Sequence, residues 1–164
     1  MIEINREYPH KLSRFGRFAL LLALSVFSTF ALSQQVADHN PAPGVSIGGY
    51  SPVSYFTENR AEKGSAEFAV SHDGRTYYLT SAEQVALYNE NPGKYRPRYH
   101  YCAYSVSLGR SLPLDPTNFK VTGDTLLLFH VSEDFNGRDL WNSQEESDEV
   151  LIERADKQFT LFNF

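Results

Sequence analysis

The chain has 164 residues, of which 20 are acidic and 15 are basic, so its formal net charge is −5 at pH 7. A chain of this length favours one domain, and a negative surface repels phosphate backbones, which argues against nucleic acid as a partner. The single cysteine, Cys102, excludes a disulfide within the chain.

The first 33 residues have the pattern of a secretory signal peptide. Basic residues, the last of them Arg17, precede an uncharged run from Phe18 to Ser33, which ends in the small residues that a signal peptidase reads. The apolar run of about 15 residues is shorter than the roughly 20 residues that span a bilayer. We therefore expect cleavage after Ser33 and a periplasmic or secreted protein. The alternative is that residues 1–33 stay attached as a membrane anchor.

The segment after the expected cleavage site divides into a linker and a domain. Residues 34–48 are rich in proline and glycine, which predicts a flexible linker. We expect the folded domain to occupy residues 49–164. Because Cys102 has no partner cysteine, this domain must be stabilised by its own core without a disulfide.

The first predicted element is a β-hairpin. The dipeptide Asp73-Gly74 favours a type I′ turn. With that turn, two apolar cross-strand pairs share one side of the hairpin: Phe68 with Leu79, and Val70 with Tyr77. His72 falls on the same side but next to the turn, opposite Arg75.

A helix is predicted directly after the hairpin. Thr80 and Ser81 are both suitable N-caps, because Glu83 and Gln84 stand three residues after them and complete a capping box in either case. The helix should end before Asn91-Pro92, since proline disfavours helical geometry in the residue that precedes it.

A second hairpin is predicted around Gly123-Asp124, where glycine in the first turn position suits a type II′ turn. Four apolar side chains would then share a face: Phe119, Val121, Leu126 and Leu128. His130 extends this face at the end of the second strand. Histidines in such places, His72 included, are expected at the rim of the core.

The C-terminal part is predicted to be helical. Residues 134–145 have some acidic residues of a calcium-binding loop, but Asp139 stands where that loop requires glycine, so we expect the start of a helix instead. Ser143 and Glu146 form a further capping box. An apolar stripe at helical spacing follows it: Leu151, Ala155, Phe159 and Phe162.

Together these elements predict an α+β fold. A small antiparallel sheet made of two hairpins, with three or four helices packed on it, would form a single domain. The many tyrosines have two interpretations, since aromatic side chains either fill a small core or line a pocket for a flat ligand.

Several short segments occur in an order and spacing typical of one family: residues 49–56 (Gly-Tyr-Ser-Pro-Val-Ser-Tyr-Phe), Lys63-Gly64-Ser65, Tyr77-Tyr78 with Ser81, Asn91-Pro92 with Lys94-Tyr95, residues 101–104 (Tyr-Cys-Ala-Tyr), Asp115-Pro116, Trp141 and Ala155-Asp156. Through them the chain resembles secreted bacterial YHS-domain proteins over about residues 49–159. The resemblance implies a small module from a family that is linked to metal handling.

The chain departs from this family at the positions that matter for metal. The metal-handling relatives have three cysteines at the positions matched here by Ser54, Thr80 and Gln84, and Ser51 replaces an aspartate of the secreted branch. Serine and threonine hydroxyls are poor ligands for soft metals, which prefer sulfur. We therefore expect no metal to be held through these positions.

The remaining candidate site is centred on Cys102. His100 lies two residues before it, and His72 or His130 could join them through folding, which would give a candidate site for a transition metal ion such as zinc. Two alternatives stand beside this one. Cys102 could be a small buried hydrophobe, as free cysteines often are, and its apolar and aromatic neighbours favour this. It could also be a reactive thiol with His100 as its base.

The sequence thus favours a non-catalytic role over an enzyme. We expect a periplasmic accessory or binding module whose partner is an unidentified small ligand, a metal ion or an envelope protein. A membrane would be a partner only if residues 1–33 are retained. The alternatives are a thiol-dependent enzyme that uses Cys102 and a purely structural interaction domain.

Overall fold

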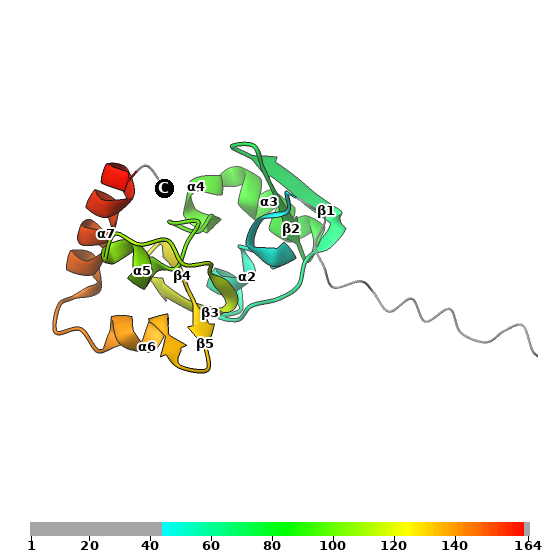
Figure 1. Ribbon diagram of the computed structural model, residues 1–164. Helices are drawn as coiled ribbons and strands as arrows, with labels where there is room; N and C mark the ends of the chain where they lie inside the picture. Colours follow the sequence, from blue (N-terminus) through cyan, green and yellow to red (C-terminus); the bar gives the residue numbers. More distant parts are fainter. Residues whose placement is uncertain (1–43, 163–164) are drawn as a thin grey trace, which may run out of the picture. The chain divides into compact units, whose positions relative to one another are not determined.

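A computed structural model of the protein describes residues 44–162, so the predicted signal peptide and most of the predicted linker lie outside the described residues. The elements follow in this order (Figure 1): η2 (Ser46–Gly49), α2 (Ser54–Thr57), β1 (Ser65–His72), β2 (Arg75–Leu79), α3 (Ala82–Glu90), α4 (Pro92–Tyr95), α5 (Ala103–Ser107), β3 (Asp115–Thr122), β4 (Thr125–Phe129), β5 (Val131–Ser132), β6 (Phe135–Asn136), α6 (Gly137–Asn142) and α7 (Asp148–Phe162).

The predicted α+β class is confirmed. The strands pair in sequence order as antiparallel hairpins, β1 with β2, β3 with β4, and the short β5 with β6, and helices pack around them. No helix between residues 44 and 162 has the length and apolar character that a membrane span requires.

The folded region begins before Gly49, the expected start of the domain. Val45 forms a parallel bridge with Thr76, and the side chain of Ile47 is only 8% exposed and belongs to the core. Ile47 also has a left-handed backbone conformation (φ 46°, ψ 38°), which is rare for a β-branched residue. Residues 45–48 are therefore part of the packed domain, because the core takes up Ile47.

The first hairpin has the predicted turn. Asp73 and Gly74 both have positive φ, 49° and 72°, as a type I′ turn requires, and Val70 pairs with Tyr77. The predicted pairing of Phe68 with Leu79 is wrong, because the register shifts between residues 65 and 69 and Leu79 pairs with Ser65 instead. The extra residues in β1 form an irregularity that two-residue alternation cannot anticipate.

Both helix boundaries around α3 follow local signals. Of the two candidate N-caps, Ser81 caps the helix, and its hydroxyl accepts a hydrogen bond from the Gln84 amide at 3.3 Å. The helix ends at Glu90, as predicted. The side chain of Asn91 then caps the short helix α4, which starts at Pro92, where the missing N–H of proline costs nothing.

The second hairpin separates two apolar clusters. Gly123 has a positive φ of 55°, and the four side chains predicted to share a face pair across the hairpin, Phe119 with Leu128 and Val121 with Leu126. The side chains of a strand alternate between its two faces, and those of β4 are buried on both. One face of β4 contributes Leu126 and Leu128 to a cluster with the first hairpin, α3 and α4. The other face contributes Leu127 and Phe129 to a cluster with α5, α6 and α7.

The C-terminal helices differ in part from prediction. A helix does start near residue 136, where the Asn136 side chain caps α6. The predicted capping box at Ser143 is wrong, since Ser143 ends α6 and α7 begins only at Asp148. Leu151 and Ala155 are buried as the apolar stripe predicts, and Phe159 is partly buried. Phe162 is 57% exposed, because it lies at the end of α7 beyond the cluster.

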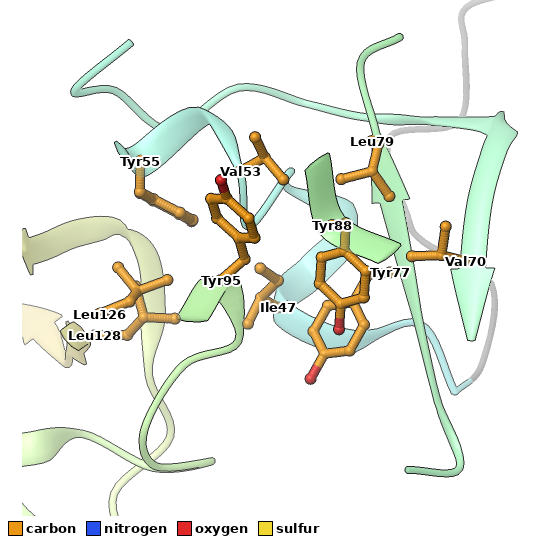
Figure 2. Packing of buried hydrophobic residues seen from close by; sticks show 10 residues of the cluster. All are labelled: Ile47, Val53, Tyr55, Val70, Tyr77, Leu79, Tyr88, Tyr95, Leu126 and Leu128. Atoms are coloured by element: carbon orange, nitrogen blue, oxygen red, sulfur yellow. The ribbon is translucent and has the colours of Figure 1, made fainter. Parts of the chain in front are cut away.

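Most aromatic side chains within residues 44–162 belong to the two core clusters, in agreement with the first of the two interpretations. In the first cluster, the rings of Tyr77 and Tyr88 lie with centroids 5.5 Å apart, and Figure 2 shows their hydroxyls pointing in the same direction. The hydroxyl of Tyr55 donates a hydrogen bond to the Pro116 carbonyl at 2.8 Å. The Tyr88 hydroxyl is buried and has no hydrogen-bond partner among the described residues.

Candidate functional site

Three of the four positions at which this chain differs from the YHS-domain proteins that it resembles lie next to one another in the structure. Ser51 lies just before α2, Ser54 is the first residue of α2, and Gln84 lies in the first turn of α3. The Gln84 carboxamide joins them, since its Oε1 accepts a hydrogen bond from Ser51 Oγ at 2.6 Å and its Nε2 donates one to Ser54 Oγ at 2.9 Å. Both serines are fully buried.

The fourth position, Thr80, contributes its backbone rather than its side chain. The Thr80 amide donates a hydrogen bond to Gln84 Oε1 at 3.1 Å. The Gln84 oxygen therefore accepts two hydrogen bonds, and its nitrogen donates one. Residues that are 30 and 33 positions apart are thus linked through one side chain, and buried polar groups that would otherwise be costly are paired.

The network continues to the surface through Glu62. A hydrogen bond from Ser54 lowers the pKa of the Glu62 carboxyl, whereas partial burial raises it. Arg60, which forms an ion pair with Glu62, also lowers this pKa, and the net shift is downward. The Glu62 carbonyl also accepts a hydrogen bond from the Ser51 amide at 2.8 Å. We call Ser51, Ser54, Gln84 and Glu62 the serine–glutamine network.

This network does not fit the transition metal ion that the resemblance implies. Its donors are hydroxyl, carboxamide and carboxylate oxygens, with no thiolate or imidazole, and they are already hydrogen-bonded to one another. Soft metals prefer sulfur and nitrogen ligands. Within residues 44–162, no three side chains of histidine, cysteine, aspartate or glutamate are grouped closely enough to hold a metal ion.

The second candidate site is not assembled either. Cys102 is fully buried in the cluster with α5, α6 and α7, while His100 lies at the surface. His72 is at the end of β1, where its Nε2 lies 3.3 Å from Asp73 Oδ2. The predicted set of Cys102, His100 and His72 is thus divided between the interior and two surface positions, because the chain turns inward at Cys102 to start α5.

The thiol of Cys102 is packed against the start of α6. A Cβ atom placed on Gly137 would lie 2.8 Å from Cys102 Sγ, closer than real contacts allow. The Cys102 amide and carbonyl both have partners, Leu112 and Val106. A buried sulfur so enclosed acts as a small hydrophobe, so the structural alternative for Cys102 agrees with its position.

The histidines His72 and His130 lie at strand ends, as predicted. His130 follows β4, and its Nδ1 lies 3.0 Å from the Pro113 carbonyl. His100 differs from both. Partial desolvation lowers its pKa, and the positive charges of Arg75 and Arg96 lower it further. His100 also lines a surface hollow of about 310 Å³ together with Arg75 and Tyr99.

A charged group next to this hollow ties residues 98 and 99 to α7. Arg98 forms two hydrogen bonds to the Asp156 carboxylate, at 2.8 and 2.6 Å, and the Tyr99 hydroxyl donates to the same carboxylate at 2.8 Å. Partial burial would raise the pKa of Asp156, but these hydrogen bonds outweigh it and the pKa is lowered. The group fixes the segment that carries His100.

Sequence reasoning missed the roles of Glu62, Arg75 and Arg96. Glu62 lies in the connection between α2 and β1, Arg75 follows the turn of the first hairpin, and Arg96 follows α4. None of them has a neighbour in sequence that suggests a site. The hairpin pattern predicts Arg75 only as the residue opposite His72. One signal was present, since an arginine after a type I′ turn projects from the end of the hairpin, but its neighbour His100 is 25 positions away and no local pattern connects them.

Comparison of the chain with family models, with curated proteins and with solved structures finds no match to any of them.

Proposed function

We propose that the chain is a periplasmic, non-catalytic binding or accessory domain of the YHS class, in which the serine–glutamine network occupies the place of the family's metal ligands. The observation that carries this proposal is the Gln84 carboxamide, which bonds Ser51 and Ser54 at once. These are the positions, with Thr80, at which the resembled family has its cysteines and an aspartate. A hydrogen-bonded set of this kind stabilises the junction between α2 and α3 without a metal.

The position of Cys102 supports a non-catalytic role. A thiol nucleophile has to reach its substrate and be deprotonated by a nearby base, whereas Cys102 is fully buried and His100, its candidate base, lies at the surface. Alkylation of the folded protein with iodoacetamide near neutral pH separates the two roles. We expect labelling only at the rate of unfolding, and rapid labelling of the folded protein would favour the thiol-dependent enzyme.

The metal content of the protein tests the proposal directly. We would purify the chain without chelator and measure bound metal by elemental analysis, together with the variants Ser54→Ala, Thr80→Ala and Gln84→Ala. Ser71→Ala, an exposed serine in β1, is the matched control. We expect no metal that depends on these positions. Stoichiometric metal in the wild type that is lost in Ser54→Ala, Thr80→Ala or Gln84→Ala but kept in Ser71→Ala would overturn the proposal.

The periplasmic location rests on residues 1–33, which lie outside the described residues. Their order of basic, apolar and small residues supports export. N-terminal sequencing of protein recovered from the cell envelope should begin at or near Gln34. Recovery of chains that start at Met1 in the membrane fraction would indicate an anchor instead.

A further inference from the structure

The hollow beside His100 has one wall that is both strained and apolar. Residues 45–48 form this wall, and Ile47 within it keeps its left-handed backbone (φ 46°). Conformations of this kind persist only where the surrounding structure holds them, and they cluster at ligand sites. Leu114 and Pro116 add further apolar surface. The volume of about 310 Å³ is at the lower end of that of small-molecule sites.

Another part of the lining is cationic. Arg75 lines the hollow together with His100 and Tyr99. Arg96 forms an ion pair with Asp73 at 2.8 Å, and Arg98 forms one with Asp156. Arg75 differs from both, because within residues 44–162 no acidic side chain lies within ion-pair distance of it.

The charges around His100 are therefore unbalanced in one direction. The positive fields of Arg75 and Arg96 reach His100 and disfavour its protonated form, in addition to the effect of desolvation. An anion between Arg75 and His100 would offset this repulsion and accept charge-assisted hydrogen bonds from the guanidinium. A cation would be repelled by the same groups.

We propose that this hollow binds a small organic acid, whose carboxylate contacts Arg75 and His100 and whose apolar body packs against Val45, Leu114 and Pro116. The inference deepens the proposed binding function and rests on it. It assigns a ligand class to a place that neither the serine–glutamine network nor Cys102 occupies. The apolar wall favours a carboxylate with an aliphatic or aromatic body over an inorganic anion, which could not use that surface.

The test follows the imidazole signals of His100 by NMR during titration of the full chain with benzoate. The chain has five histidines, and the spectrum of His100→Gln identifies the signal. We expect benzoate to shift this signal in a saturable way and to raise the pKa of His100, because the carboxylate stabilises the imidazolium. Benzamide, a neutral compound of the same shape, should have no such effect at equal concentration.

Two arginine variants connect the effect to this hollow. Arg75→Gln should raise the dissociation constant for benzoate about tenfold or more, which is the loss expected for a charge-assisted hydrogen bond. Arg75→Lys, which keeps the charge but not the two-pronged geometry, should fall between. Arg110→Gln is the matched control, since Arg110 is exposed and does not line the hollow. It removes the same charge and should leave the constant unchanged within about twofold.

Three results would overturn the inference. These are a His100 signal that does not respond to benzoate, an equal response to benzamide or to inorganic phosphate, and an equal loss of affinity in Arg75→Gln and Arg110→Gln. Elemental analysis of the same samples distinguishes a failure of the organic acid site from a failure of the proposed function. A metal-free protein whose His100 signal does not respond to benzoate contradicts only the organic acid site, whereas metal held by Ser54, Thr80 or Gln84 contradicts the proposed function.

Discussion

Gln84 and Ser54, which are 30 residues apart in sequence, are joined by a buried hydrogen bond of 2.9 Å. The other half of the same carboxamide accepts a hydrogen bond from Ser51 at 2.6 Å. Because all three residues are buried, each hydrogen bond replaces one that water would make in the unfolded chain. The loss of one member leaves the others unpaired in the interior, and an unpaired buried polar group is costly.

Truncation of the network should therefore destabilise the domain. Ser54→Ala and Ser51→Ala should each lower the free energy of unfolding by about 1–3 kcal/mol, because the Gln84 carboxamide loses a partner that water cannot replace. Urea denaturation midpoints measure the effect. The exposed Ser71→Ala is the control and should change the free energy by less than about 0.5 kcal/mol. Wild-type midpoints for both buried serine variants would show that the network contributes nothing to stability.

The contact between Cys102 and Gly137 predicts a coupled pair. Gly137→Ala adds a Cβ atom that would lie 2.8 Å from Cys102 Sγ, so it should cost about 1–3 kcal/mol in the wild type. In a Cys102→Ala background the sulfur is gone and the cost should fall, although the His130 carbonyl at 3.3 Å remains. A double-mutant cycle should give a coupling energy of about 0.5 kcal/mol or more. Additive costs would contradict the contact.

Cys102 itself should tolerate alanine better than serine. Cys102→Ala leaves a small void that costs about 1 kcal/mol, whereas Cys102→Ser places a hydroxyl in an apolar cluster at a cost of about 1–3 kcal/mol if it finds no partner. Denaturation midpoints rank the two variants. Equal, wild-type stability of both would be inconsistent with a structural thiol.

Removal of the hydroxyl should have different effects on stability at Tyr88 and at Tyr55. Tyr88→Phe removes a buried hydroxyl that has no partner among the described residues, so it should leave the free energy of unfolding unchanged or raise it by up to about 1 kcal/mol. Tyr55→Phe is the matched change in the same cluster. It removes the hydrogen bond to the Pro116 carbonyl and should cost about 1 kcal/mol. A larger loss for Tyr88→Phe than for Tyr55→Phe would reverse this ranking and refute the assignment.

Asp148 should make stability depend on pH in the acidic range. Burial raises its pKa, but hydrogen bonds from Lys120 and Trp141 outweigh this, and the pKa is lowered overall. The folded state therefore favours the carboxylate. Its contribution is fully present above the unfolded pKa of about 3.9 and is lost as the pH falls through the lower folded value.

Asp148→Asn removes that contribution. It should lower the free energy of unfolding by about 1–2 kcal/mol at neutral pH, and the difference from the wild type should shrink below about pH 4. Asp134→Asn, which removes an exposed charge that has no ion pair within residues 44–162, is the control and should show neither effect. Denaturation at several pH values measures both. A difference that stays constant down to the lowest pH would show that the carboxylate charge is not responsible.

The features that could be predicted from sequence depend on a few neighbouring residues. The Asp73-Gly74 turn and the Ser81 cap follow from backbone geometry that one or two side chains determine. The capping box at Ser143 has the same local pattern, yet there the tertiary structure prevails. Residues 143–147 connect α6 to α7, whose first turn places Asp148 against Lys120 and Trp141.

The candidate sites depended on contacts between distant residues, which no spacing encodes. The hydrogen bond between Ser54 and Gln84 requires α2 and α3 to be in contact. The hollow requires Arg75 of β2 to lie near His100, which belongs to the segment between α4 and α5. The predicted pairing of Phe68 with Leu79 fails for a related reason, since an irregularity in β1 shifts the register and is set by packing. The burial of Cys102 was within reach, because its apolar neighbours indicate it.

We propose that hydrogen bonds, rather than a metal, stabilise the junction of α2 and α3. The most direct measurement is the thermal unfolding midpoint of the wild-type full chain, before and after treatment with EDTA and after addition of Zn²⁺. A structural metal contributes its binding free energy to folding. We predict the same midpoint under all three conditions, because Gln84 already satisfies Ser51 and Ser54. A midpoint that falls with EDTA and is restored by Zn²⁺, with both changes absent in Ser54→Ala, would contradict the claim.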